Sequence, residues 1–158
     1  MAQRIIAIDQ STSSTKALLF DEECRLLART NVDHKQYYPQ TGWVEHDAEE
    51  IYQNMIEAIR KLMAEVDLHY SLVPHTFSLA ITNQRETAVV WNKTTGKPIA
   101  NAVVWQDTRG AELCRQLRAD GKAAMVMQKS GLLIDPNFSV TGIKWLLDNI
   151  PGACEHCR

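Results

Sequence analysis

The first 31 residues constrain the fold most strongly, because they hold three short apolar segments joined by connections too short for a helix. The segments are residues 4–8, 16–20 and 25–31, separated by polar residues 9–15 and 21–24. The first connection is rich in Ser and Thr, whose hydroxyl groups bond to nearby backbone and favour turns. Parallel strands need a crossover of about a dozen residues or more. The spacing therefore predicts a three-stranded antiparallel meander.

A single amphipathic helix is predicted after this meander. Asp47 is a suitable N-cap, and Glu50 completes the pattern of a capping box. Residues 77–82 form the next apolar run, which we expect to be a buried strand parallel to the first. Between Glu50 and this run, apolar residues recur at the helical spacings of three and four residues. They are Ile51, Met55, Ile59, Leu62 and Val66.

The second half predicts a hairpin and then three helices. Residues 87–92 and 99–105 are β-like segments around a turn at 93–97. Helices are expected over residues 108–118, with Asp107 as a cap, and over 123–129. Ser139 or Thr141 is expected to cap a last helix that stops at Pro151. These elements together predict a mixed α/β fold.

Composition narrows the classes of function. With 158 residues, of which 45% are hydrophobic and 23% charged, the chain has the composition of a soluble globular domain. A formal net charge of -2 argues against nucleic acid or an anionic membrane as a partner. The apolar runs are far shorter than the roughly 18 residues that cross a bilayer, and the N-terminus does not resemble a secretory signal. We therefore expect a cytoplasmic protein.

The four cysteines are too few for a disulfide scaffold, so we expect reduced thiols at Cys24, Cys114, Cys154 and Cys157. The last two have C-x-x-C spacing with His156 between them, which is compatible with half of a zinc site or with a redox pair. Because no second pair of ligands accompanies them in the sequence, an incidental pair is the favoured interpretation.

Residues 9–16, DQSTSSTK, form the first candidate site. Asp9 at the end of a strand suits hydrated Mg²⁺, while hydroxyl groups, backbone N–H groups and Lys16 suit phosphate oxygens. The segment is neither a Walker A loop nor a GxGxxG loop. Because the same composition also occurs in ordinary hairpin turns, both interpretations stay open on these residues alone.

Two further candidates lie at the ends of apolar segments. Arg85 and Glu86 offer a donor fork beside an acceptor, which suits the adjacent hydroxyl groups of a polyol. The alternative is a surface turn with a weak ion pair. Trp105 ends a predicted strand, where its ring could pack on the carbon face of a small polyol, although a Trp in such a place more often belongs to a core.

Six motifs resemble those of the FGGY carbohydrate kinases, in order and spacing, and are most similar to the glycerol kinase branch. The resemblance spans residues 5 to about 149. It implies a ribonuclease-H-like fold of the actin and hexokinase type, with a three-stranded antiparallel meander at its start and a mixed sheet flanked by helices. The motifs are residues 9–16, 42–47 (GWVEHD), 81–87 (ITNQRET), 96–99 (GKPI), 101–107 (NAVVWQD) and 134–136 (IDP).

The resemblance also implies an activity, namely ATP-dependent phosphorylation of a small polyol, with glycerol as the first candidate and Mg²⁺ as cofactor. Asp9 would hold Mg²⁺ through water. The phosphates of ATP would face Thr12, Ser13 and Lys16. The polyol would be bound by Arg85, Glu86, Trp105 and Asn137.

Four residues depart from the glycerol kinase pattern. Asn137 stands where the family has a Tyr that contacts substrate, and this change should enlarge the pocket and add polar groups. Gly142 replaces the usual Lys, Gly110 a Thr and Ser11 a Gly. A longer polyol or a ketose, such as erythritol, xylulose or ribulose, therefore stays open as the substrate.

The resemblance assigns residues 1–158 to the N-terminal part of the first kinase domain. The catalytic Asp and the C-terminal ATPase domain would lie beyond Arg158, so we expect no kinase turnover from this chain alone and a homo-oligomer at full length. Two alternatives stay open. One is a non-catalytic binding module of the same fold, and the other is a small metal or redox protein built on Cys154, His156 and Cys157.

Overall fold

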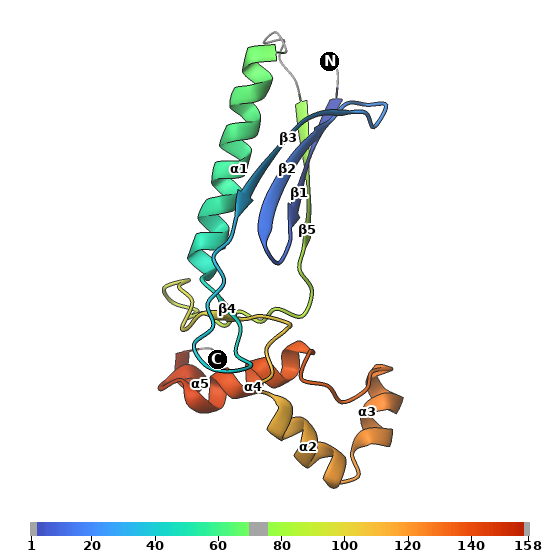
Figure 1. Cartoon of the computed structure of the whole chain (residues 1–158), viewed down its shortest axis with the longest axis vertical. Helices are drawn as coiled ribbons and strands as arrows, with labels where there is room; N and C mark the ends of the chain where they lie inside the picture. Colours follow the sequence, from blue (N-terminus) through green and yellow to red (C-terminus); the bar gives the residue numbers. More distant parts are fainter. Residues whose placement is uncertain (1–2, 70–75, 157–158) are drawn as a thin grey trace. The chain divides into compact units, whose positions relative to one another are not determined.

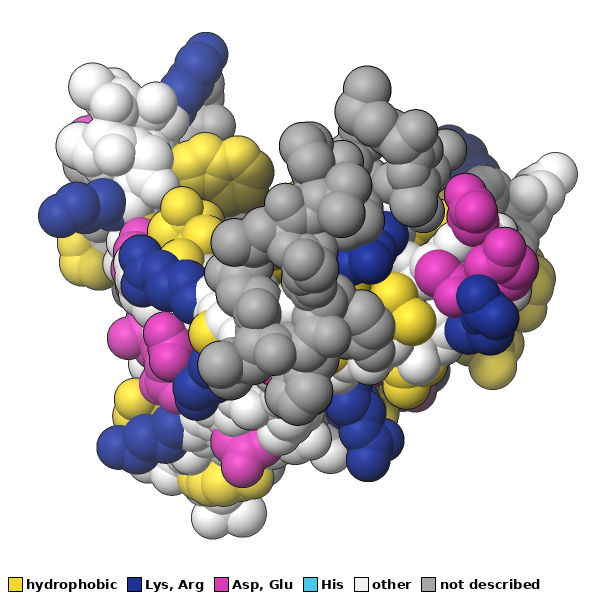
Figure 2. Space-filling model, turned by 90° about the horizontal axis from the view of Figure 1, so that it is seen from above, with side chains coloured by type: hydrophobic (Ala, Val, Ile, Leu, Met, Phe, Trp, Pro, Cys, Tyr) yellow, Lys and Arg dark blue, Asp and Glu magenta, His cyan; other side chains and the backbone are white. Residues whose placement is uncertain are grey.

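The computed structural model describes residues 3–69 and 76–156, and the chain divides into two compact units (Figure 1). Met1–Lys35 and Glu49–Gln84 form the first unit, and Gln36–Ala48 and Arg85–Arg158 form the second. Within the described ranges, no helix is both long and apolar enough to cross a membrane. On the face drawn in Figure 2, Lys and Arg side chains lie among Asp and Glu side chains, in agreement with the small net charge.

The first unit contains a four-stranded sheet in the order β3-β2-β1-β5. Its strands are β1 (Gln3–Gln10), β2 (Ser14–Phe20), β3 (Leu26–Asp33) and β5 (Thr76–Asn83). The first three pair antiparallel in sequence order, and β5 pairs with β1 in parallel. The predicted meander and the predicted parallel strand are both confirmed.

The long helix α1 (Ala48–His69) covers one face of this sheet. The hydroxyl of Thr30 on β3 donates to the carbonyl oxygen of Ala58 at 2.8 Å, which ties the strand to the helix. The predicted apolar stripe faces the sheet, because Leu62 and Val66 are buried there. The buried cluster consists of Ile6, Ile8, Ala17, Leu19, Ala28, Ala58, Leu62 and Val66.

The apolar side chains of β5 are exposed, so the expectation of a buried strand is wrong for the chain as described. The parallel register pairs Ile6 with Leu79 and Ile8 with Ile81, which places all four side chains on the same face. Leu79 and Ile81 are nevertheless 59% and 60% exposed. The reason is that α1 packs on side chains from β1, β2 and β3, while β5 lies at the end of the sheet.

The second unit is built from two short strands and the later helices. The strands β4 (Glu45–His46) and β6 (Ala102–Val103) pair antiparallel. Because β6 pairs with β4, the predicted hairpin appears only as two isolated bridges, Ala88 with Val103 and Trp91 with Pro98. The helices are α2 (Ala111–Ala119), α3 (Ala123–Ser130), α4 (Ser139–Asn149) and the short α5 (Ala153–His156), which the sequence did not predict.

The caps of these helices differ from expectation. Helix α2 follows Gly110, because Asp107 is engaged by Val44 and Arg109 instead of capping. Helix α4 follows Phe138, whose side chain makes no capping hydrogen bond. Neither Ser139 nor Thr141 is its N-cap, since Ser139 is the first helical residue and the Thr141 hydroxyl donates to the carbonyl oxygens of Pro136 and Phe138.

Two glycines, Gly110 and Gly142, lie at close contacts of α4. A Cβ atom at Gly110 would lie 2.4 Å from Oγ1 of Thr141, and a Cβ atom at Gly142 would lie 3.1 Å from Cγ1 of Val103. A side chain at Gly110 would require Thr141 or its surroundings to shift, and one at Gly142 would require Val103 to give way by a few tenths of an ångström. The two glycines therefore allow a close approach that larger residues would oppose.

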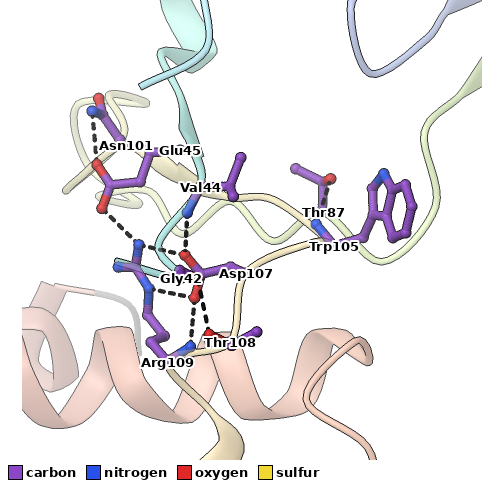
Figure 3. A network of polar contacts seen from close by, with 9 residues as sticks. All are labelled: Gly42, Val44, Glu45, Thr87, Asn101, Trp105, Asp107, Thr108 and Arg109. Atoms are coloured by element: carbon purple, nitrogen blue, oxygen red, sulfur yellow. Dashed lines mark hydrogen bonds and ion pairs between the residues drawn. The ribbon is translucent and has the colours of Figure 1, made fainter. Parts of the chain in front are cut away.

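A buried charge cluster joins distant segments of the second unit (Figure 3). The guanidinium of Arg109, 2% exposed, lies 2.7 Å from Glu45 Oε1 and 2.8 Å from Asp107 Oδ2. It also lies 4.0 Å from the ring centroid of Trp43 and 4.6 Å from that of Trp145. Burial alone would lower the pKa of Arg109, but hydrogen bonds with Asp107 and Glu45 outweigh burial and raise it.

We predict that Arg109→Ala destabilises the chain by about 3–5 kcal/mol, because it leaves the buried Asp107 carboxylate without its main cation. Chemical denaturation followed by circular dichroism measures this loss. Arg115→Ala is the matched control, since its ion pair with Glu112 is exposed and should contribute at most about 1 kcal/mol. Equal unfolding free energies for the two variants would contradict the structural role given to Arg109.

Candidate phosphate and polyol sites

The loop between β1 and β2 brings Asp9, Ser11 and Lys16 together. Asp9 and Lys16 are direct partners in the antiparallel register. The Lys16 ammonium lies 3.0 Å from Asp9 Oδ2 and donates to Ser11 Oγ at 3.2 Å. The turn is closed by the N–H of Ser11, which donates to the carbonyl oxygen of Ser14 at 2.9 Å. A carboxylate, a hydroxyl and an ammonium group thus meet at one edge of the sheet.

The charge state of this loop suits a phosphate and its cation. The hydrogen bond from Lys16 lowers the pKa of Asp9, although partial burial opposes the shift, and Ser11 adds to it. Asp9 is therefore an anion at neutral pH. Its single carboxylate fits Mg²⁺, which keeps several waters and binds through one or two carboxylates and substrate phosphates. The described residues contain no group of three His, Cys, Asp or Glu side chains placed to hold a metal ion directly.

The other two predicted phosphate residues, Thr12 and Ser13, lie within the same turn, and Ser13 is exposed. Ser13 is anchored through its carbonyl oxygen, which accepts the N–H of His34 at 2.8 Å. The buried ring of His34 has Nε2 3.1 Å from Thr15 Oγ1 and Nδ1 3.0 Å from Asn54 Nδ2 on α1. Burial lowers the pKa of His34. This anchoring residue was not identified from the sequence.

In the second unit, the carboxylate of Glu86 is bound by a residue far along the chain, Ser139. The backbone N–H and the hydroxyl of Ser139 both donate to Glu86 Oε2, at 2.9 and 2.6 Å. These bonds lower the pKa of Glu86. Arg85 is exposed. The structure therefore shows a carboxylate fixed to the start of α4.

Thr87, the residue after Glu86, is hydrogen-bonded to Trp105. The backbone N–H of Trp105 donates to Thr87 Oγ1 at 3.3 Å, and the indole ring, 39% exposed, points away from the Arg109 cluster (Figure 3). Trp105 is therefore not a core residue in the chain as described. Residues 85–87 thus contact the segments that carry Trp105 and, through Ser139, the turn that carries Asn137.

Asn137 lies in the turn before α4. Its backbone N–H donates to Asp135 Oδ1 at 2.9 Å, and its side chain is partly buried. The sequence did not single out Ser139 for this site. Its only signal was a hydroxyl residue near a helix start, which fits a local cap as well as a contact with a distant carboxylate.

The cysteines give no support to a metal centre among the described residues. Cys24, Cys114 and Cys154 are free thiols, and burial raises the pKa of Cys114. In the C-x-x-C pair, Cys157 lies outside the described residues.

The chain is similar to curated glycerol kinases. It is 50% identical over 148 residues to glycerol kinase 1 of Thermotoga maritima, which covers 94% of this chain and 30% of that protein. It is 44% identical over 154 residues to a glycerol kinase of Pseudomonas savastanoi. That match covers 98% of this chain and 30% of that protein. The chain thus spans about 30% of the length of these relatives.

Solved structures show the same fold. The glycerol kinase of Plasmodium falciparum, solved with ADP, matches with a TM-score of 0.92 at 35% identity over 98% of this chain and 30% of that one. A xylulose kinase of Rhodospirillum rubrum matches with a TM-score of 0.86 at 18% identity. That match covers 98% of this chain and 31% of that one. These matches confirm the expected fold of the actin and hexokinase type.

A model of one protein family matches residues 4–158, nearly the whole chain, and its description is the N-terminal domain of the FGGY family of carbohydrate kinases. This match agrees with the order of the six motifs and with the relatives at 44–50% identity. The chain therefore belongs to the FGGY family of carbohydrate kinases.

Proposed function

We propose that this chain is the N-terminal part of an ATP-dependent kinase that phosphorylates a small polyol, with glycerol as its first candidate substrate. The observation that carries the proposal is the Asp9, Ser11 and Lys16 cluster on a hydroxyl-rich turn in a chain of this family. The similarity to glycerol kinases supports the choice of polyol. The rest of the enzyme, including its catalytic base, would come from sequence that these 158 residues do not contain.

The phosphate loop would act through charge and position. Phosphoryl transfer depends on orienting the reactants and on neutralising the phosphate oxygens. An ammonium group has three N–H donors. Asp9 and Ser11 take two donors of Lys16, so one is left for a phosphate oxygen, with Thr12 and Ser13 beside it. Mg²⁺ would supply further charge neutralisation when bound near Asp9 through water.

The polyol would be held by a donor fork and an acceptor. Arg85 can donate to two neighbouring hydroxyl groups, and the ionised Glu86 can accept from one. The half-exposed ring of Trp105 can cover the carbon side of the substrate. Asn137 favours a second candidate within the same function, a longer polyol or a ketose, because an amide offers hydrogen bonds to an additional hydroxyl group.

The direct test is ATP-dependent turnover by the full-length gene product with glycerol, erythritol, xylulose and ribulose, measured as substrate-dependent release of ADP. We expect the highest kcat/KM with glycerol and no turnover from residues 1–158 alone. A preference for erythritol or a ketose would support the role of Asn137 in a wider pocket. ADP release that no polyol or sugar stimulates would refute the proposed function.

We predict that Arg85→Ala in the full-length enzyme raises the polyol KM by at least about tenfold, because it removes a charged hydrogen-bond donor. The KM for ATP should stay within about twofold. Arg115→Ala is the control, because Arg115 is exposed. Arg118 is not used, because its guanidinium donates to the carbonyl oxygen of Ile134. Unchanged polyol kinetics in Arg85→Ala would exclude Arg85 from the polyol site.

We predict the opposite pattern for Lys16→Met, which removes the cation of the phosphate loop but keeps most of the side-chain volume. The KM for ATP should rise by about tenfold or more, while the polyol KM changes little. Lys61→Met is the matched control, because Lys61 is exposed on α1 and pairs only weakly with Glu57 at 3.7 Å. An ATP KM equal to that of the control would exclude Lys16 from phosphate binding.

A further inference from the structure

The carboxylate of Glu86 caps helix α4 from 53 residues away. The first N–H groups of a helix have no partner within the helix, and the N-cap Phe138 supplies no side-chain acceptor. Glu86 Oε2 accepts the N–H of Ser139, the first residue of α4, at 2.9 Å. A carboxylate at this end is also favoured by the helix dipole. The contact therefore serves the helix and the carboxylate together.

The Ser139 hydroxyl makes this contact specific. It donates to the same oxygen, Oε2, at 2.6 Å, a distance typical of a hydroxyl bound to a charged acceptor. The hydrogen bonds that described residues make to Glu86 thus fall on Oε2. Its other oxygen, Oε1, remains directed to no donor in the part of the chain that the structure describes. Within this one carboxylate, Oε2 is held by Ser139, and Oε1 is available to accept a hydrogen bond from a ligand.

The backbone of Glu86 indicates that this placement is enforced. Glu86 has φ = 66°, in the left-handed region that residues other than Gly adopt at a cost in free energy. Such a conformation persists when its surroundings hold it firmly. The two bonds from Ser139 provide that hold. They also connect Glu86 to the turn that carries Asn137, two residues before Ser139.

We infer that Ser139 is a positioning residue for substrate recognition, which fixes Glu86 through Oε2 so that Oε1 can accept a hydrogen bond from a hydroxyl group of the polyol. This inference rests on the proposed function for its substrate. The same hydrogen bonds have a second effect, because they lower the pKa of Glu86. Removing the hydroxyl should therefore both loosen the carboxylate and raise its pKa toward the ordinary value of a glutamate.

The first experiment needs no kinase activity. The side-chain carboxyl carbon of Glu86 is titrated by ¹³C NMR in residues 1–158, in the wild type, in Ser139→Ala and in Ser139→Thr. Ser130→Ala is the control, because it removes a hydroxyl from the end of α3. We expect the pKa of Glu86 to be higher in Ser139→Ala than in the wild type. In Ser139→Thr and Ser130→Ala it should equal the wild-type value. An unchanged pKa in Ser139→Ala would overturn the inference.

The second experiment measures kinetics of the full-length gene product with its best polyol. Ser139→Ala should raise the polyol KM by about tenfold and leave the ATP KM within about twofold, since the backbone N–H bond remains. The acid limb of the kcat/KM profile should move to higher pH, because a carboxylate with a raised pKa is protonated earlier as the pH falls. Ser139→Thr keeps the hydroxyl group, so its polyol KM and the acid limb of its kcat/KM profile should equal those of the wild type.

The outcomes separate the inference from the proposed function. A wild-type enzyme that turns over a polyol, with a Ser139→Ala variant of equal KM and equal acid limb, overturns the role of Ser139 and leaves the function standing. A wild-type enzyme without polyol turnover refutes the function and, with it, the substrate role of Ser139. If Ser139→Ala does not fold by circular dichroism, Ser139→Cys replaces it, because a thiol of similar size is a weak donor.

Discussion

The antiparallel pairing of β1 with β2 is the constraint on which the first unit depends. It places Ile8 beside Ala17 in the core under α1, and in the next pair it places Asp9 beside Lys16. Because neighbouring residues of a strand point to opposite faces, a slip of one residue would exchange core and charged positions. The same register thus builds the apolar core and fixes the distance between the carboxylate and the ammonium group.

The features that followed from the sequence are those set by local spacing. The short connections after residues 8 and 20 decide the meander, and helical periodicity decides the face of α1 that Leu62 and Val66 occupy. The features that did not follow depend on partners far along the chain. Arg109 is paired with Glu45 across 64 residues, and Ser139 with Glu86 across 53. A hydroxyl near a helix start gives the same local signal whichever partner it has.

A few hydrogen bonds hold the residues of the proposed polyol site in the second unit. Residues 85–87 contribute an exposed guanidinium at Arg85, an anchored carboxylate at Glu86 and a hydroxyl at Thr87 that accepts the N–H of Trp105. The charge cluster of Arg109 holds the segment that follows Trp105. Rigid support of this kind matters because donors and acceptors that are ordered before the ligand arrives lose less conformational freedom on binding.

The terminal strand β5 has a consequence for handling the protein. Its sequence, TFSLAITN, contains no charged residue and no proline, the devices by which natural edge strands avoid pairing with other molecules. It also presents Leu79 and Ile81 at its surface. Short, uncharged segments of this kind stack readily into intermolecular sheets. When residues 1–158 are produced alone, this strand therefore offers an edge to which a second molecule can pair, and a lysine on its exposed side would oppose that pairing.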